Sequence, residues 1–257
     1  MNFKTKSILV LATALVGTAA MSQTAAPAAP AAPESTLSFN VGVVSDYRFR
    51  SVSQTSFKPA LQGGVDFAHA SGAYIGAWAS NVSWIKDYVG ATDGTSEVDL
   101  YLGYKGAISA DLAFDIGVIT YQYPGNTADK VLVNANTTEV YGALTYGIAT
   151  VKYSQSTGNF IANPNSSGSS YLELAATFDL GSGFSLTPHV GRQTIPNQAG
   201  NAGDYTDFSL ALGKDFGGGL TGSLTAYSTD AKDAFYKVGT FDNLGKSGLS
   251  AGIKYAF

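Results

Sequence analysis

Apolar and polar residues alternate with a period of two along most of this chain. Apolar side chains occupy every second position in the segments 98–104, 172–180 and 249–257, and polar or small residues fill the positions between them. A β-strand points successive side chains to opposite faces, whereas a helix would repeat its apolar positions every three or four residues. The pattern therefore predicts strands that each have one apolar and one polar face.

About twelve segments of this kind are present, each about 9–12 residues long, which is the length that crosses a bilayer when a strand is tilted. In the segment 73–82 both alternating residue sets are compatible with lipid, so its orientation stays open. The expected strands are 36–46, 57–68, 73–82, 96–105, 110–121, 137–146, 148–156, 170–180, 183–193, 205–216, 219–228 and 247–257.

The connections between these segments alternate between short and long. Short ones carry turn residues, as in Gly181-Ser182-Gly183 and Gly217-Gly218-Gly219, and long ones hold most of the Asn, Ser, Asp and Pro. This is the pattern of an outer-membrane barrel, with tight turns on the periplasmic side and longer loops outside. A soluble β-sandwich also has alternating strands, but it does not require connections that alternate in length. We therefore predict an all-β, transmembrane, antiparallel up-and-down β-barrel of about twelve strands.

Composition excludes several other classes of protein. Charged residues make up only 13% of the chain, against about 25% in a typical soluble domain. No apolar run of about 20 residues follows the first 25, so helical membrane spans are excluded from the mature protein. The chain has no Cys, which excludes disulfides, thiolate metal sites and a Cys nucleophile. No cluster of Lys and Arg provides a footprint for nucleic acid.

The N-terminus predicts export from the cytoplasm. Lys4 and Lys6 precede an apolar stretch at 8–21, and small residues at 18–20 or 24–26 offer two cleavage sites, as in a secretory signal. We assign 1–24 to a signal peptide, 25–35 to an Ala/Pro linker and 36–257 to the barrel, located in the outer membrane of a Gram-negative bacterium after cleavage. Without the two lysines, 13 basic side chains oppose 19 acidic ones, which gives a net charge of −6.

Aromatic residues next to the short turns predict a girdle at the periplasmic membrane boundary, where such rings prefer to lie. The chain also ends in Tyr255-Ala256-Phe257, and a terminal Phe after alternating apolar residues resembles the signal that the outer-membrane assembly machinery recognises. We take Tyr255 and Phe257 as this signal. The expected girdle residues are Phe67, Tyr74, Tyr104, Tyr146, Phe184, Phe216 and Phe257.

A family resemblance is carried by the stretch SDYRFRSVSQT at 45–55, followed by PALQGGVD at 59–66. Together with 76–81, 99–104 and the C-terminus, it resembles the TorF family, a proteobacterial group of porin-like proteins first described as conserved hypothetical proteins. The resemblance covers 36–257, and Ser51 stands where the family pattern leads us to expect Gly. It implies an outer-membrane barrel that lets small solutes diffuse, and it implies no defined substrate.

The polar face of each strand is expected to line the lumen. A barrel of about twelve strands is narrower than porins of about 16–18 strands, so side chains should partly fill it and favour selective passage. Acids outnumber bases among these residues, and carboxylate rings concentrate cations, so we expect a mild cation preference. Pairing of these charges across the lumen is the alternative. The candidates are Arg48, Arg50, Lys58, Asp66, Glu97, Asp99, Tyr101, Asp115, Glu139, Lys152, Glu173 and His189.

Arg48 and Arg50 lie two residues apart at the outer end of the first strand, which predicts that they face the same way. Two guanidinium groups on one lumen edge could form a constriction that orients anionic or hydroxylated solutes. Alternatively, they bind Asp46, Asp66 or loop carbonyls and fix the first outer loop, which is the interpretation we favour.

Two other classes of function are less well supported by the sequence. An outer-membrane lipid hydrolase would need a base, and only His69 and His189 are available, without a nucleophile motif around either. A structural or adhesive barrel would act through its outer loops, which carry few aromatic residues apart from Trp84, Tyr88 and Tyr236. We predict no enzymatic activity and no metal or other cofactor. The expected partners are outer-membrane lipid, the assembly machinery and small solutes, and a homo-oligomer is a further option.

Overall fold

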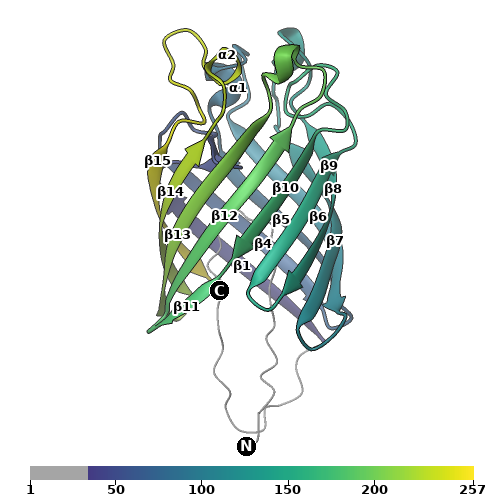
Figure 1. Cartoon of the computed structure of the whole chain (residues 1–257), viewed down its shortest axis with the longest axis vertical. Coiled ribbons are helices and arrows are strands. Elements are labelled where there is room, and N and C mark those ends of the chain that lie inside the picture. The colour runs from purple at the N-terminus through teal and green to yellow at the C-terminus, as the bar shows by residue number, and fades with distance from the viewer. Residues whose placement is uncertain (1–33) are drawn as a thin grey trace, which may run out of the picture.

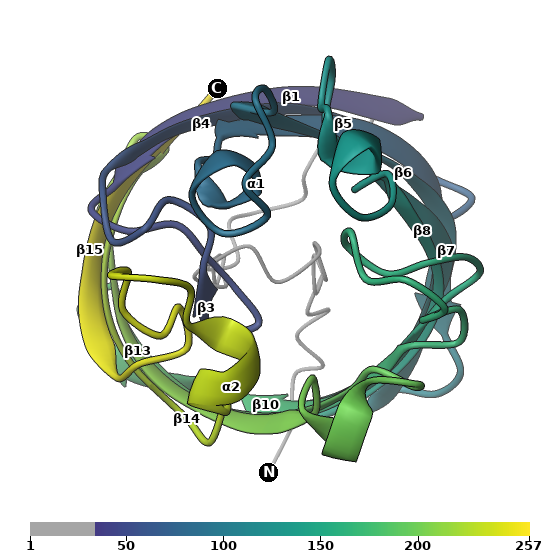
Figure 2. The same cartoon turned by 90° about the horizontal axis from the view of Figure 1, so that it is seen from above.

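A computed structural model of the chain describes residues 34–257. The predicted signal peptide and nearly all of the predicted linker lie outside the described residues, and the first strand begins at Ser35. The strands of the main sheet stand side by side (Figure 1) and form a ring when seen from above (Figure 2). They are β1 (Ser35–Val44), β4 (Ala60–His69), β5 (Ala73–Asn81), β6 (Ser96–Ala107), β7 (Leu112–Gln122), β8 (Thr137–Tyr146), β9 (Ala149–Ser156), β10 (Ser170–Ala176), β11 (Phe178–Gly181), β12 (Phe184–Thr194), β13 (Tyr205–Gly217), β14 (Leu220–Thr229) and β15 (Gly248–Ala256).

These strands form one closed antiparallel barrel. Each pairs with its neighbours in the order β10-β9-β8-β7-β6-β5-β4-β1-β15-β14-β13-β12-β11, and β10 also pairs with β12. β10 and β11 are two parts of one spanning strand, interrupted at Thr177, so the barrel has 12 strands. The first and last strands close it, with Asn40 opposite Ala256. The predicted fold class and strand number are therefore confirmed.

The two faces of the sheet follow the alternation of the sequence. Large apolar side chains on the outside are exposed, as at Leu37 (60%), Leu102 (55%) and Leu249 (67%), whereas the polar set faces the lumen. The apolar set can stay exposed because lipid rather than water covers it in a membrane barrel.

The orientation of β5 corrects one prediction. The hydroxyl of Tyr74 lies 2.5 Å from Oδ1 of Asp115, and Trp78 meets the ring of Tyr47 edge-on, so both aromatic side chains face the lumen. Tyr74 therefore does not belong to the lipid-facing girdle, whereas the other predicted girdle residues are exposed beside the short turns. Ile75 takes the lipid side of β5, at 55% exposure.

Glycines opposite the lumen tyrosines let these rings lie flat against the wall. A Cβ added at Gly76 would come within 2.4 Å of the Tyr101 ring on β6, and one at Gly117 would come within 2.5 Å of the Tyr141 hydroxyl on β8. A side chain larger than hydrogen at these positions would push the rings toward the barrel axis. The pairing therefore preserves space inside the barrel.

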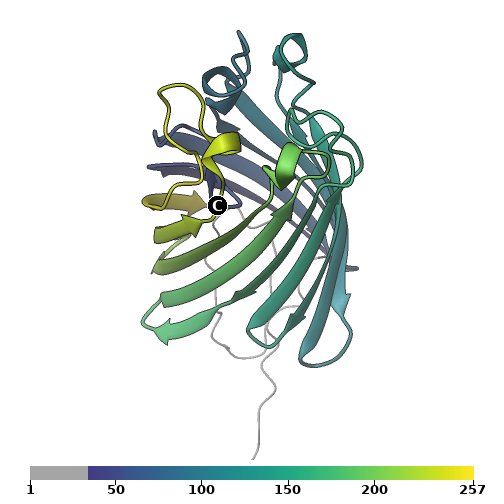
Figure 3. The ribbon, with the colours of Figure 1, turned by 45° about the horizontal axis from the view of Figure 1, so that its top comes forward.

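The connections separate the two ends of the barrel, as the sequence predicts. Short turns join the strands at the end where β1 begins and β15 ends, and long loops gather at the other end (Figure 3). Those loops contain the one-turn helices α1 (Trp84–Asp87) and α2 (Asp233–Tyr236) and two 3₁₀ turns, η1 (Ala128–Lys130) and η2 (Ala199–Asn201). Over residues 34–257, no helix has the length and apolar character needed to cross a membrane.

Candidate functional site

The first long loop runs toward the middle of the barrel when seen from above (Figure 2), and its side chains bond to residues on the inner wall. We call residues 45–59 the finger. It contains a small hairpin of β2 (Arg48–Phe49) and β3 (Val52–Ser53), joined by Arg50 and Ser51. Both turn residues have left-handed backbone angles, with φ of 48° and 65°, as a type I′ turn requires. This explains why a glycine would be expected where Ser51 stands.

Arg48 fixes the base of the finger. Its Nε donates to Oδ2 of Asp46 at 2.7 Å, and its Nη1 donates to the backbone carbonyls of Ser51 at 3.1 Å and Lys246 at 2.8 Å. The other oxygen of Asp46 accepts from the hydroxyl of Ser53 at 2.6 Å. For Arg48, these contacts match the predicted alternative in which the arginine fixes the first loop.

Arg50 binds the tip of the finger to the opposite wall of the barrel. Its two terminal nitrogens donate to Oε2 of Glu139 on β8 at 2.7 Å and to Oε1 of Gln193 on β12 at 2.8 Å. The guanidinium lies 4.4 Å from the ring centre of Tyr171 on β10, and the hydroxyl of Tyr205 donates to the Arg50 carbonyl at 3.0 Å. β8 and β10 flank β9, and β12 follows β10. Because β9 is opposite β1 in the strand order, the side chain at the finger tip reaches the wall opposite the strand from which the finger starts.

The prediction that Arg48 and Arg50 face the same way is therefore wrong. The rule for alternate residues holds along a continuous strand, but β1 ends at Val44 and the chain turns inward. The turn at Arg50 then places that side chain at the tip, while Arg48 stays at the base.

Two further hydrogen bonds hold the sides of the finger. The Tyr47 hydroxyl donates to Oε1 of Glu97 on β6, and the Ser51 hydroxyl donates to Oδ1 of Asp207 on β13, each at 2.7 Å. Burial, together with the charges of Glu97 and Asp99, raises the pKa of Tyr47 well above its usual value, so it stays a donor. The finger is thus bound to several separate parts of the wall.

Tyrosine hydroxyls donate hydrogen bonds to most of the lumen carboxylates, and we call these pairs the tyrosine–carboxylate wall. A neutral hydroxyl satisfies an acceptor oxygen without cancelling the negative charge, unlike a Lys or Arg partner. The pairs are Tyr47–Glu97 at 2.7 Å, Tyr101–Asp66 at 2.5 Å, Tyr74–Asp115 at 2.5 Å, Tyr121–Glu139 at 3.1 Å and Tyr171–Asp207 at 2.8 Å.

The remaining predicted lumen residues complete this arrangement, with one exception. Lys152 lies over the ring of Tyr141 at 4.3 Å, and Nε2 of His189 lies 3.2 Å from Oε2 of Glu173. Lys58 is exposed in the turn before β4. It precedes β4 instead of lying on it, because the left-handed turn at 56–57 and Pro59 delay the start of the strand until Ala60. Its role as a pore-lining residue stays a prediction.

Three lumen carboxylates have an oxygen without a protein partner. They are Oε2 of Glu97, Oδ1 of Asp99 and Oε1 of Glu139, all in buried side chains. A buried carboxylate needs a hydrogen-bond donor, a cation or a proton of its own to balance its charge, so each of these oxygens can take water, a cation or a proton. Within residues 34–257, no three His, Cys, Asp or Glu side chains are grouped to hold a metal ion.

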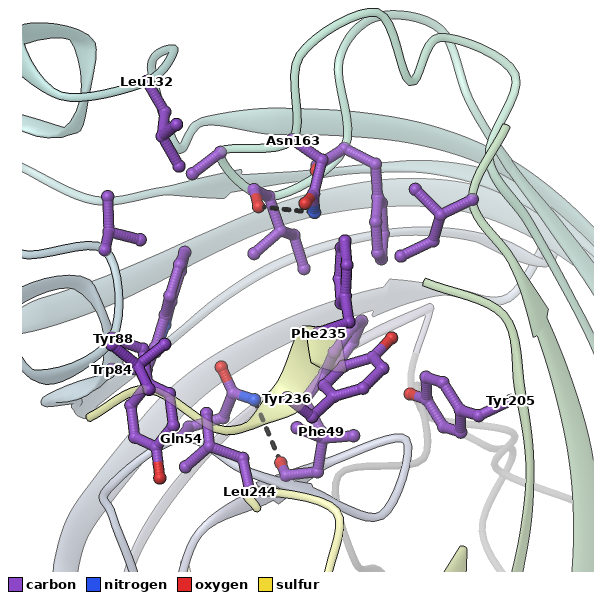
Figure 4. A pocket seen from close by; sticks show the side chains of 17 residues that line it. Phe49, Gln54, Trp84, Tyr88, Leu132, Asn163, Tyr205, Phe235, Tyr236 and Leu244 are labelled. Atoms are coloured by element: carbon purple, nitrogen blue, oxygen red, sulfur yellow. Dashed lines mark hydrogen bonds between the residues drawn. The ribbon is translucent and has the colours of Figure 1, made fainter. Parts of the chain in front are cut away.

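An apolar cavity at the outer end of the barrel was not predicted from the sequence. We call it the outer cavity; it has a volume of ≈ 270 Å³. Figure 4 shows Trp84 and Tyr88 on one side of it and Tyr205 and Tyr236 on the other, with Phe49 of the finger below them. The aromatic residues Trp84, Tyr88 and Tyr236 in the outer loops were the one sequence feature that could have indicated this cavity. The sequence around each of them does not show that the loops come together.

Comparisons with known proteins agree with the fold. A family model described as "Bacterial protein of unknown function (Gcw_chp)" matches residues 27–257, and no curated protein matches the sequence. The NanC porin is 12% identical, with 86% of this chain and 99% of that chain covered and a TM-score of 0.49. A chain from a study of in-meso crystallization of membrane proteins is 7% identical over 86% and 83%, with a TM-score of 0.53.

Pseudomonas aeruginosa OprD is 12% identical, with 86% of this chain and 66% of that chain covered and a TM-score of 0.41. Of these three, the chain with a TM-score of 0.53 supports the barrel fold, and at 7% identity it shows the fold alone. The resemblance to the TorF family stays a prediction.

Proposed function

The chain belongs to the Gcw_chp family of bacterial proteins, and from its lumen we propose that it is a passive channel for small solutes in the outer membrane. The observation that carries this proposal is the finger, which crosses a polar lumen and is held by Arg50 at the opposite wall. A loop in this position narrows the lumen and makes every solute pass between its side chains and the wall. We infer selective rather than bulk diffusion.

The charge of the lumen supports a preference for cations. Arg48 and Arg50 are each paired with a carboxylate, Asp46 and Glu139 respectively. By contrast, Asp66 accepts a hydrogen bond from the neutral hydroxyl of Tyr101, which does not cancel the negative charge of the carboxylate. Negative side chains along a pore concentrate cations and repel anions. Potassium should therefore pass more readily than chloride.

The remaining expectations fit this location in the cell. The apolar outer face is suited to outer-membrane lipid, the signal peptide would direct export, and a second copy could pack against the same face. We propose that Tyr255 and Phe257 are recognised by the assembly machinery, because both rings are exposed to the lipid side. The Phe257 amide bonds to the Phe39 carbonyl at 2.9 Å, so this signal ends up at the barrel closure.

The alternatives receive less support. His189 lies against Glu173, Asp207 and Tyr171, and these contacts are those of a wall residue rather than of a base beside a serine nucleophile. This arrangement does not favour a lipid hydrolase. A non-conducting structural or adhesive barrel, with the finger acting as a plug, would have the same fold and is separated from a channel by conductance.

Planar-bilayer recording of the purified protein tests the proposal. In a potassium chloride gradient we expect single-channel currents whose reversal potential shows potassium preference. Asp66→Asn removes one lumen charge while keeping an acceptor for the Tyr101 hydroxyl, and it should shift the reversal potential toward chloride. Asp129→Asn, in an outer loop beside Lys130, is the matched control and should not shift it.

Two results would contradict parts of the proposal. Barrels that conduct no current and show no solute flux in liposome swelling would indicate the structural or adhesive alternative. Currents that favour chloride would leave a channel but overturn the proposed role of the tyrosine–carboxylate wall.

A further inference from the structure

The outer cavity lies between the finger and the surrounding outer loops. The finger contributes Phe49 and Val52, and the loops contribute apolar and aromatic side chains that include Trp84 and Phe160. Phe49 also meets the ring of Tyr121 on the wall, with ring centres 5.2 Å apart. The cavity floor is therefore fixed to the barrel and does not depend on the loops alone.

The lining of the outer cavity carries no formal charge. None of its residues is Asp, Glu, Lys, Arg or His. Its tyrosine hydroxyls are already committed: Tyr88 donates to the Asp242 carbonyl, Tyr236 to the Gly203 carbonyl at 2.6 Å and Tyr205 to the Arg50 carbonyl. What the cavity offers to an occupant is mainly aromatic and aliphatic surface, which differs sharply from the acidic lumen below.

The titration of these tyrosines agrees with a neutral lining. Burial, together with the charges of Asp242 and Asp87, raises the pKa of Tyr88 to about 12. Burial, with a further contribution from the charge of Asp204, also raises the pKa of Tyr236. Both rings therefore stay uncharged at neutral pH, and a charged occupant would lose its hydration without gaining a partner.

One polar group in the lining lacks a partner. The indole Nε1 of Trp84 is buried and makes no hydrogen bond within the protein, although the ring itself packs edge-on against Tyr123 with ring centres 5.4 Å apart. A buried N–H group without an acceptor is costly. The nitrogen is closed off from the cavity, so an occupant would contact the ring of Trp84 and not its N–H group.

The volume limits the size of the occupant. An apolar cavity of about 150 Å³ holds benzene, so ≈ 270 Å³ has room for two fused rings. We propose that the outer cavity binds an uncharged bicyclic aromatic molecule. This site is separate from conduction through the lumen, and it would hold its ligand against the outer surface of the finger.

Coumarin is a suitable probe, because it is uncharged and bicyclic and has a charged analogue with the same rings. The chain has 2 Trp residues, so Trp78→Phe leaves Trp84 as the only indole. In the reconstituted full-length barrel, coumarin should quench the Trp84 emission in a saturable manner. Coumarin-3-carboxylate, which has the same rings and a negative charge, should not saturate the site over the same range.

Two neighbouring substitutions separate binding in the cavity from partition into lipid. Leu132 lines the cavity and Val131 does not, yet both are 50% exposed in the same loop. Leu132→Asp should weaken coumarin binding at least about tenfold, and Val131→Asp should leave it unchanged. Because both positions are half exposed, neither variant should prevent folding.

Quenching that never saturates, equal binding of the carboxylate, or equal losses at Leu132 and Val131 would each overturn the proposal. None of these readouts depends on whether the barrel conducts.

Discussion

Replacing Arg50 with alanine tests whether the finger tip is the narrow point of the lumen. The change removes the hydrogen bonds to Glu139 and Gln193 and the contact with the Tyr171 ring. Glu139 is fully buried and one of its oxygens already lacks a partner. Tyr205 bonds to the Arg50 backbone, so that contact remains available to the variant.

The size of the effect follows from the burial of the ion pair, whose side chains are 7% and 0% exposed. Removing one partner of a buried pair costs about 3–5 kcal/mol, because the other charge is left without compensation. At about 1.4 kcal/mol for each factor of ten, the ratio of docked to undocked tip falls by a factor between about 10² and about 4 × 10³. The loss applies to docking of the tip, because the barrel hydrogen bonds are unchanged.

Single-channel recording in planar bilayers measures this change. We expect Arg50→Ala to raise the mean conductance and the open-channel noise, because the tip leaves the far wall and moves within the lumen. Potassium preference should also rise, since a positive charge is lost and Glu139 is uncovered. Arg50→Lys keeps the charge but not the two-pronged geometry of the guanidinium, so it should have an intermediate effect.

Arg192→Ala is the matched control. Arg192 lies near the outer end of β12, is 50% exposed and pairs with Asp204, so its removal deletes the same charge without freeing the finger. If Arg50→Ala leaves conductance and noise at the wild-type level, or if Arg192→Ala changes them equally, the tip does not limit the passage.

Three further predictions concern the wall, the lipid face and assembly. Gly76→Ala should displace the Tyr101 ring, destabilise the barrel by about 1–3 kcal/mol and lower the conductance. Gly158→Ala, whose added Cβ would have no atom within 4 Å, should change neither the stability nor the conductance. Leu102→Arg places a charge in the lipid and should lower the free energy of unfolding in vesicles by about 2–4 kcal/mol, measured by denaturant titration. Phe257→Ser should reduce the amount of folded barrel in isolated outer membranes if the terminal ring is the assembly signal, and unchanged amounts would refute that role.

The barrel itself could be predicted because the sequence features that indicate it are local. Alternation at every second residue and alternating connection lengths are visible in any short stretch of the sequence, and they indicated all twelve spanning strands. β5 shows where this fails: Tyr74 and Ile75 are both compatible with lipid, and the choice depends on Asp115, which lies two strands away in the barrel. No pattern within β5 contains that contact.

The site was harder to predict because it is built by a loop that changes direction. The sequence predicted that Arg48 and Arg50 lie in the lumen, but their separate roles depend on the left-handed turn formed by the two residues after Phe49. Ser51 is not a residue type that predicts such a turn. Tyr88 and Tyr236 lie about 150 residues apart in the chain, yet both line the outer cavity. Contacts of this kind arise from barrel closure rather than from any local signal.

The finger also has a mechanical consequence. Its two ends continue into the neighbouring strands β1 and β4, and its tip is bonded to the opposite wall, so it spans the barrel as a crossbeam. A hollow ring of strands can be flattened by lateral pressure from the surrounding bilayer, whereas a ring braced across its diameter resists that deformation. The same contacts that narrow the passage therefore also keep the cross-section of the barrel round.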